Sequence, residues 1–324
     1  MMREKQVGFS LLETMASLAV LLIVGGIVMT GMTQLMKTQA SVANRTDMHS
    51  SVRSATELLQ QEIGQAGKIS LGSPSANVSL QSAVTAGAAS PFSLIASDNS
   101  TVMVYPNEYL WVDVGSKQEA IQVATANTHG YSGTVVVFQL PHAAGAPVVA
   151  LGAFGTGVVP PAAAPASLQY GSSPTVLKLY GDINGDGNMV YVEYTCAQGT
   201  QANPGYLYRH QMSITAGSKT ANDNTMILLN NVLGNPNDAS GNLVPCFAYQ
   251  VQTLGGGYCV TDVAVTLTVQ TQNKDLQTNQ FQPETKALLN VAPRNVVEVY
   301  DTASLVDPLR NQPMPLTVAN LLNP

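Results

Sequence analysis

Charged side chains are scarce in this sequence. They make up 10% of the 324 residues, against about a quarter in an ordinary soluble domain. Fourteen Lys and Arg against twenty Asp and Glu give a formal net charge of −6, and the cations form no cluster. Proteins that bind nucleic acid usually carry a basic patch. We therefore expect no nucleic acid partner, and a surface made mostly of uncharged polar residues.

Catalytic signatures are also missing. No His-Glu-x-x-His, no zinc spacing of Cys and His and no Gly-x-Ser-x-Gly turn occurs. The glycines of residues 152–157 do not follow the order of a nucleotide-binding turn. The histidines are scattered along the chain: His49, His129, His142 and His210. We expect a protein that is not an enzyme and needs no cofactor.

Cysteine is rare as well, with Cys196, Cys246 and Cys259 only. If this part of the chain is exported, an oxidising compartment favours one disulfide and leaves one thiol over. Cys246 and Cys259 are our first predicted pair because they close a short loop that contains three consecutive glycines. Cys196 is the alternative partner.

One long apolar run stands out, at about residues 14–36. As a helix it is about 35 Å long, enough to cross the hydrocarbon of a bilayer. Residues 1–8 are a short polar leader with Arg3 and Lys5, so the positive-inside rule places the leader in the cytoplasm and the rest outside. We expect a single-pass inner-membrane protein with an extracytoplasmic C-terminal head.

Glu13 is the one ionisable residue at the head of this run. A carboxylate there costs on the order of 2 to 3 kcal/mol unless it finds a partner. Cleavage after Gly8 on the cytoplasmic face would create a positive amine on Phe9, one helical turn from Glu13. The sequence thus supplies a partner for the carboxylate if the leader is removed.

The stretch Gly8-Phe9-Ser10-Leu11-Leu12-Glu13 resembles the type III signal of type IV prepilins and pseudopilins. In that family a membrane-embedded prepilin peptidase cuts after the Gly and methylates the new amino terminus. The resemblance implies Gly8 as the cleavage position, Phe9 as the methylated residue and Glu13 as the assembly contact to a neighbouring subunit's amine.

Thr30 is a departure from the family, because many major pilins have a helix-bending proline there. Gly25, Gly26 and Gly31 could loosen the helix instead.

Apolar or small residues continue at three- to four-residue spacing beyond the run, which predicts an amphipathic extension of the helix. They are Met48, Val52, Ala55, Leu59, Ile63 and Ala66. We expect one helix over residues 9–66, ended by Gly67. Residues 55–67 also resemble the helix end of PilW-type minor pilins.

The remaining chain predicts an α+β fold in which mainly antiparallel strands pack on this helix. Residues 70–100 have the composition of a loop. The Pro/Ala-rich stretch 159–168 predicts a linking loop that divides the head into residues 67–158 and 169–324. The strands predicted from β-branched and aromatic residues are 101–105, 109–114, 119–125, 134–140, 146–151, 175–180, 189–195, 205–211, 226–232, 246–252, 260–271 and 294–300. Residues 262–271 and 293–296 together resemble the closing strands of PilW-type proteins.

A possible calcium loop begins at Asp182, with oxygen donors at alternate positions and a closing carboxylate. The predicted ligands are Asp182, Asn184, Asp186, the carbonyl of Asn188 and Glu193. The flanks have the pattern of strands, not of the two helices of an EF-hand. The alternative is a polar hairpin turn in which Asn-Gly and Asp-Gly supply positive φ.

The resemblance implies a minor pilin of a type IV pilus that primes or caps the filament. Its partners would be the prepilin peptidase, other minor and major pilins and the inner-membrane assembly platform, and its final place would be the pilus at the cell surface. Two alternatives stay open. One is the J-type pseudopilin of type II secretion; the other is a membrane-anchored adhesin or binding domain that does not polymerise. A cleaved secretory signal is less favoured, because the apolar core far exceeds the usual 7 to 15 residues.

Overall fold

The structure is a computed structural model that describes residues 10–87, 91–100, 102–126, 132–135, 137–162, 169–255, 257–305 and 307–323. The chain forms two compact units. The first consists of Met1–Ser50 with Gln270–Pro283, and the second of Ser51–Val269 with Glu284–Pro324.

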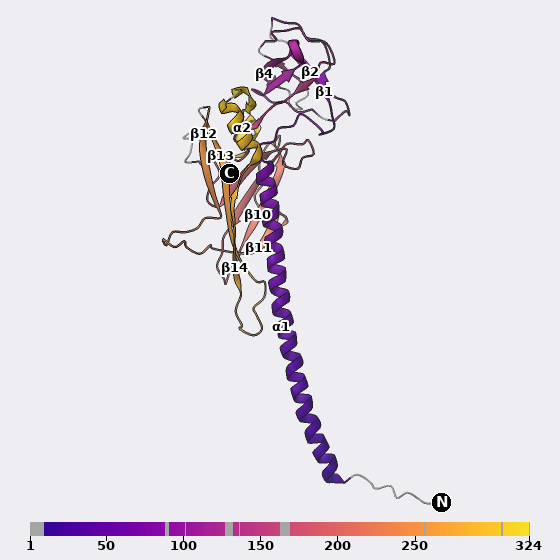
Figure 1. The fold of residues 1–324 in the computed structure, drawn as a ribbon, viewed down its shortest axis with the longest axis vertical. Coiled ribbons are helices and arrows are strands. Elements are labelled where there is room, and N and C mark those ends of the chain that lie inside the picture. The colour runs from indigo at the N-terminus through magenta and orange to yellow at the C-terminus, as the bar shows by residue number, and fades with distance from the viewer. Residues whose placement is uncertain are drawn as a thin grey trace, which may run out of the picture. The chain divides into compact units, whose positions relative to one another are not determined.

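Helix α1, Leu11–Gln65, is continuous and confirms the long N-terminal helix (Figure 1). It begins at Ser10, whose hydroxyl accepts a hydrogen bond from the Leu12 amide at 3.3 Å. It ends at Gly67, where φ is +84° and a Cβ atom would lie 2.7 Å from the Phe154 carbonyl oxygen. Gly67 then donates its amide to the Tyr180 carbonyl at 2.9 Å, so the chain leaves the helix to join the head.

The glycines of the apolar half do not break α1. The helix runs through Gly25, Gly26 and Gly31 without interruption. Thr30 donates its hydroxyl to the Gly26 carbonyl at 2.8 Å. A hydroxyl satisfied within its own helix leaves no polar group unbonded in a membrane.

A seven-stranded sheet in the second unit has the order β12-β13-β11-β10-β9-β8, with β14 also paired to β13. Its strands are β8 (Val176–Gly181), β9 (Val190–Ala197), β10 (Gly205–Ser213), β11 (Ile227–Leu233), β12 (Phe247–Leu254), β13 (Gly257–Gln270) and β14 (Pro283–Val291). The pairings from β8 to β12 are antiparallel. Leu59 and Ile63 of α1 are fully buried, and Glu62 between them bonds to side chains of β9 and β10. The outer part of α1 therefore covers this sheet.

A six-stranded sheet in the same unit has the order β1-β2-β5-β4-β3-β6. Its strands are β1 (Val78–Leu80), β2 (Pro91–Ala96), β3 (Tyr109–Val112), β4 (Glu119–Ala126), β5 (Ser132–Val135) and β6 (Val148–Val149). Phe92, Leu110, Val123 and Phe138 belong to a hydrophobic core of its own. The region predicted as a loop, residues 70–100, thus contributes two strands.

Short elements complete the second unit. They are β7 (Ala153–Phe154), which pairs in parallel with β15 (Asn311–Gln312), α2 (Arg294–Leu305), α3 (Leu316–Leu321), and the 3₁₀ helices η1 (Gly115–Lys117), η2 (Asn224–Met226) and η3 (Pro308–Arg310).

The strand predicted at residues 294–300 was wrong, because these residues form α2. Val296 and Val299 are buried at helical spacing, and Asn295 donates its side-chain amide to the carbonyl of Gln65 at 3.0 Å, at the end of α1. The β-branched residues that suggested a strand pack here as one face of a helix. Residues 102–105, also predicted as strand, are irregular, while β14 was not predicted.

Candidate functional site: the exposed N-terminal helix

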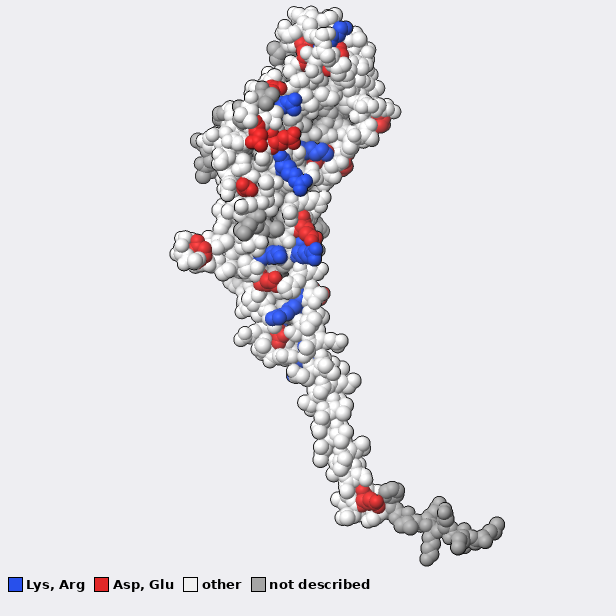
Figure 2. Space-filling model, viewed as in Figure 1, with Lys and Arg blue, Asp and Glu red and all other residues white. Residues whose placement is uncertain are grey.

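The first thirty residues of α1 are exposed in this chain, although most of them are apolar. All of residues 11–40 are exposed, and an 18-residue window within α1 reaches a mean hydropathy of 2.2. Figure 2 shows this part of α1 almost free of charged atoms, except for an acidic group near its beginning. Within the described part of the chain, α1 is the one helix long and apolar enough to span a membrane. The predicted membrane span is therefore supported by length, composition and exposure.

Glu13 lies in the first turn of α1, with its side chain exposed. The amides of Glu13 and Thr14 both donate to the Ser10 carbonyl, at 3.0 and 3.1 Å. Ser10 and Glu13 have the spacing of a capping box, and the helix dipole favours a carboxylate at this end. Gly8 and Phe9 lie outside the described residues, so cleavage and methylation remain predictions.

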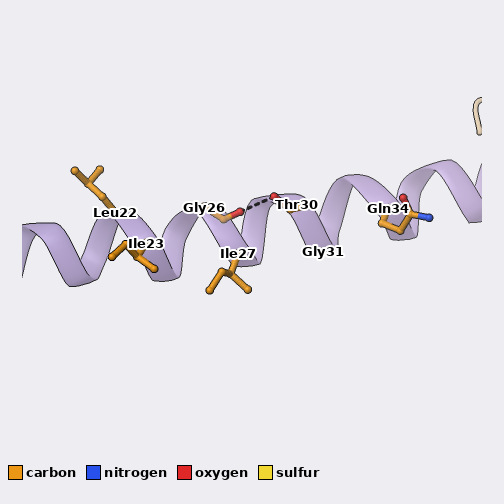
Figure 3. Close-up of a pocket in the computed structure, with 7 residues that line it drawn as sticks. All are labelled: Leu22, Ile23, Gly26, Ile27, Thr30, Gly31 and Gln34. Carbon is orange, nitrogen blue, oxygen red and sulfur yellow. Dashed lines mark hydrogen bonds between the residues drawn. The ribbon is translucent and has the colours of Figure 1, made fainter.

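A shallow groove lies on the apolar half of α1 where small residues follow one another by one turn (Figure 3). Its lining residues are Leu22, Ile23, Gly26, Ile27, Thr30, Gly31 and Gln34. A Cβ atom added to Gly26 or Gly31 would meet nothing within 4 Å. These glycines are thus not required by packing inside this chain, and they leave room for the close approach of another helix.

The outer part of α1 is fastened to the sheet by Glu62. The carboxylate accepts hydrogen bonds from Arg209 Nε at 3.0 and 3.2 Å, from Arg209 Nη2, and from the Tyr194 hydroxyl at 2.5 Å. Burial and the neighbouring Glu62 charge raise the pKa of Tyr194 well above its usual value, so its hydroxyl stays a donor. This contact was not predicted, although Glu62 lies between Leu59 and Ile63 on the apolar face of the helix.

The predicted calcium ligands have other partners. Asp182 is 1% exposed, its Oδ2 accepts from Lys68 Nζ at 2.8 Å, and its Oδ1 accepts from the Gly187 amide at 3.2 Å. Glu193 on β9 accepts from the Tyr191 hydroxyl at 2.6 Å and from Lys219 Nζ at 3.0 Å. Each of these two carboxylates thus already has a lysine partner.

The turn itself follows the hairpin alternative. Gly185 and Gly187 have φ of +71° and +89°, and Asp186 accepts from the Asn188 amide at 2.9 Å. In the described chain, no three His, Cys, Asp or Glu residues are grouped so that they could hold a metal ion. The lysine partners and the turn geometry favour the hairpin alternative over calcium binding by Asp182, Asn184, Asp186, Asn188 and Glu193.

The predicted disulfide between Cys246 and Cys259 is replaced by one between Cys196 and Cys246. The Cys246 carbonyl bonds to the amide of Thr266, while Cys259 pairs with Gln252 further along the β12–β13 hairpin. Thr266 and Cys259 are seven residues apart on β13, or about 23 Å, whereas a disulfide needs Cα atoms within about 7 Å.

The observed bridge has a Cα–Cα distance of 6.5 Å. It forms because the start of β12 approaches the start of β8, where the Phe247 amide donates to the Pro174 carbonyl at 3.0 Å. Cys259 is free and buried.

Among the histidines, His142 is buried between two carboxylates. Its Nε2 lies 2.7 Å from Glu119 Oε1 and its Nδ1 lies 3.2 Å from Asp113 Oδ2. These contacts tie the segment after β5 to β3 and β4.

Comparisons with known proteins give no match, either among family models, among curated proteins or among solved structures. The class defined by the fold is an α+β protein with one long N-terminal helix, half of it apolar and exposed, and a mostly antiparallel β head.

Proposed function

We propose that this protein is a minor pilin of a type IV pilus, most similar to the PilW type, and that it is a structural subunit without catalytic activity. The observation that carries the proposal is the exposed apolar half of α1, with Glu13 in its first turn, directly after the Gly8-Phe9 junction. A soluble binding domain would expose this apolar surface to water. A subunit that passes from a bilayer into a bundle of helices would cover it with lipid first and with neighbouring helices afterwards.

The proposed cycle starts with insertion of α1 into the inner membrane. Prepilin peptidase removes residues 1–8 and methylates Phe9, and the assembly platform moves the subunit into a filament with other minor and major pilins. There the groove at Gly26 and Thr30 admits a neighbouring helix, and Glu13 pairs with a neighbouring amine. Glu62 keeps the head fixed to the outer part of α1 while the apolar part is exchanged from lipid to protein.

The chemical state of the amino terminus tests the proposal. Mass spectrometry of the membrane-extracted protein should find a chain that begins with methylated Phe9. Gly8→Leu should leave full-length precursor, because a bulky side chain does not enter the narrow peptidase subsite. Gly25→Ala is the matched control, since its Cβ would meet nothing within 4 Å. Normal processing of the Gly8 variant, or an intact Met1 in the natural protein, would favour an anchored domain that does not polymerise.

Glu13→Ala tests the assembly contact. We expect normal cleavage and insertion but reduced incorporation into filaments, because a buried charge that loses its partner costs about 3 to 5 kcal/mol. The smaller of these free energies corresponds to a reduction of about a hundredfold in the equilibrium for incorporation. Glu57→Ala, on an exposed part of the same helix, should be incorporated normally. The measurement is the amount of each variant in sheared pili, and incorporation of Glu13→Ala at the level of the natural protein would contradict the assembly contact. Recovery of the natural protein with secretion components instead of pili would favour the J-type pseudopilin.

A further inference from the structure

The loop between β13 and β14, residues 271–282, lies beside α1 just beyond the apolar run (Figure 1). Both segments belong to the same compact unit. The hydrogen bonds that join them are Gln277 Nε2 to Thr38 Oγ1 at 3.1 Å, Ser41 Oγ to Asp275 Oδ2 at 2.5 Å and Asn44 Nδ2 to the Asn273 carbonyl at 2.7 Å. We call residues 271–282 the membrane-proximal loop.

Asp275 organises the tip of this loop. Its Oδ1 accepts from the amides of Gln277 and Thr278 at 2.8 and 2.9 Å. The Ser41 hydroxyl and these amides lower the pKa of Asp275 to about 2, so the carboxylate is charged at any physiological pH. The Asp275 carboxylate thus bonds to amides of the loop and to Ser41 of α1. The side chain of Leu276, the next residue, is 59% exposed.

The height of the tip above the bilayer follows from the helix geometry. Thr38 is two residues beyond Met36, a rise of about 3 Å. The apolar run is about 5 Å longer than a 30 Å hydrocarbon layer, so Thr38 lies about 3 to 8 Å outside it. The headgroup layer is about 5 to 8 Å thick on each side. Leu276, next to the residue that bonds Thr38, therefore lies at the level of the lipid headgroups.

The charges around the tip suit the same surface. Lys37 and Lys274 are exposed, and Lys274 Nζ lies 5.6 Å from the ring centre of Phe281. Asp275, the acidic residue of the loop, is buried, and its carboxylate is hydrogen-bonded to the turn and to Ser41. A cation, an aromatic ring and an exposed leucine in one short loop are features of segments that lie in a membrane interface.

We propose that the membrane-proximal loop is a second membrane contact of this protein, in which Leu276 enters the outer headgroup layer of the inner membrane and Lys37 and Lys274 meet lipid phosphates. The proposal rests on the membrane-spanning part of the proposed function and not on filament assembly. Such a contact limits the tilt of α1 before the subunit leaves the bilayer, and extraction into a filament must break it.

The test is a depth measurement on the full-length protein in vesicles of phosphatidylcholine and phosphatidylglycerol. An environment-sensitive NBD label is attached to Leu276→Cys, and quenching by lipids with a headgroup-level spin label is recorded. Cys259 is buried and the other cysteines are bridged, so the unsubstituted chain serves as the labelling blank. Leu243→Cys, 71% exposed in the segment between β11 and β12, is the matched exposed-leucine control, and Met29→Cys within the apolar run reports the span.

We expect the label at 276 to emit at shorter wavelength and to lose intensity with the headgroup quencher, while the label at 243 behaves as in water. Lys274→Glu in the 276-labelled chain should reduce the quenching, and more strongly when the vesicles contain the anionic lipid. A label at 276 that behaves like the one at 243, while the label at Met29→Cys is quenched by lipids that carry the spin label on an acyl chain, would overturn the loop contact and leave the span intact. An unquenched label at 29 would instead overturn the span, and the loop proposal with it.

Discussion

Glu62→Leu should strongly destabilise the head, because Glu62 is the acceptor on which two side chains of the sheet depend. Without it, Arg209 keeps its bond to Gln211 but loses its ionic partner, and the buried Tyr194 hydroxyl loses its acceptor. Removing one member of a buried ion pair costs about 3 to 5 kcal/mol. Glu62 is 4% exposed and Arg209 21%, so partial solvation of Arg209 favours the low end, about 3 kcal/mol. For a protein of this size that corresponds to a fall in Tm of about 6 to 12 °C.

The measurement is thermal unfolding of the full-length protein in detergent, followed by circular dichroism of the β head. Arg53→Ala is the matched control, because it removes an ion pair to Glu57 on the same helix in which both side chains are mostly exposed. We expect no measurable change in Tm for that variant.

A double-mutant cycle separates the pair from each residue's own packing. Glu62→Leu with Arg209→Leu should be less destabilised than the sum of the single variants, by about 1 to 3 kcal/mol, because no unpaired charge remains. Additive effects in the cycle, or a Tm of Glu62→Leu equal to that of the unmodified protein, would refute the role assigned to this contact.

The remaining predictions concern the cysteines and the turn at Asp182. Non-reducing peptide mapping should recover Cys196 linked to Cys246, and Cys196→Ser should lower stability by about 4 kcal/mol in the loop-entropy estimate for a separation of 50 residues; a Cys246–Cys259 peptide would contradict this. Burial raises the pKa of the Cys259 thiol to about 11, so the unfolded chain loses this proton at lower pH than the folded one, and stability should fall between about pH 9 and pH 11, a dependence that Cys259→Ala should remove. Asp182→Asn should lower the Tm by weakening its buried bond to Lys68, whereas millimolar calcium should leave the Tm of the natural protein unchanged; calcium-dependent stabilisation would restore the metal site.

Local patterns predicted some elements well and others poorly, and the difference has a physical cause. The strands near residues 190–197, 205–213 and 257–270 match the prediction because they are rich in the β-branched and aromatic residues that pack well on a sheet. In α2 the same types of β-branched residue form the buried face of a helix. Which residues of α2 are buried depends on the elements that it packs against, and these are set by the tertiary structure. The strands β1 and β2 are short and lie in a segment rich in Ser, Ala and Gly. β2 pairs with β5 much further along the chain, Pro91 with Thr134, and no local pattern shows such a partner.

The candidate site divides in the same way. The apolar half of α1 could be predicted because a membrane span requires only length and hydropathy, both of which are local. The fate of Asp182 and Glu193 could not, because the lysines that pair with them are 114 and 26 residues away along the chain. A loop of alternating oxygen donors describes the spacing of the ligands but not the charges that surround them.

The sequence by itself determined the long helix, its apolar half with Glu13 at the start, and the α+β composition of the head, because each depends on residues within one or two turns of one another. Only the tertiary structure decided which cysteines are bridged, that Glu62 receives Arg209 and Tyr194, and that the loop of residues 271–282 lies beside the end of the apolar run. Each of these contacts joins residues at least fifty positions apart, and their meeting depends on how the strands are ordered in the sheet, which no local pattern specifies.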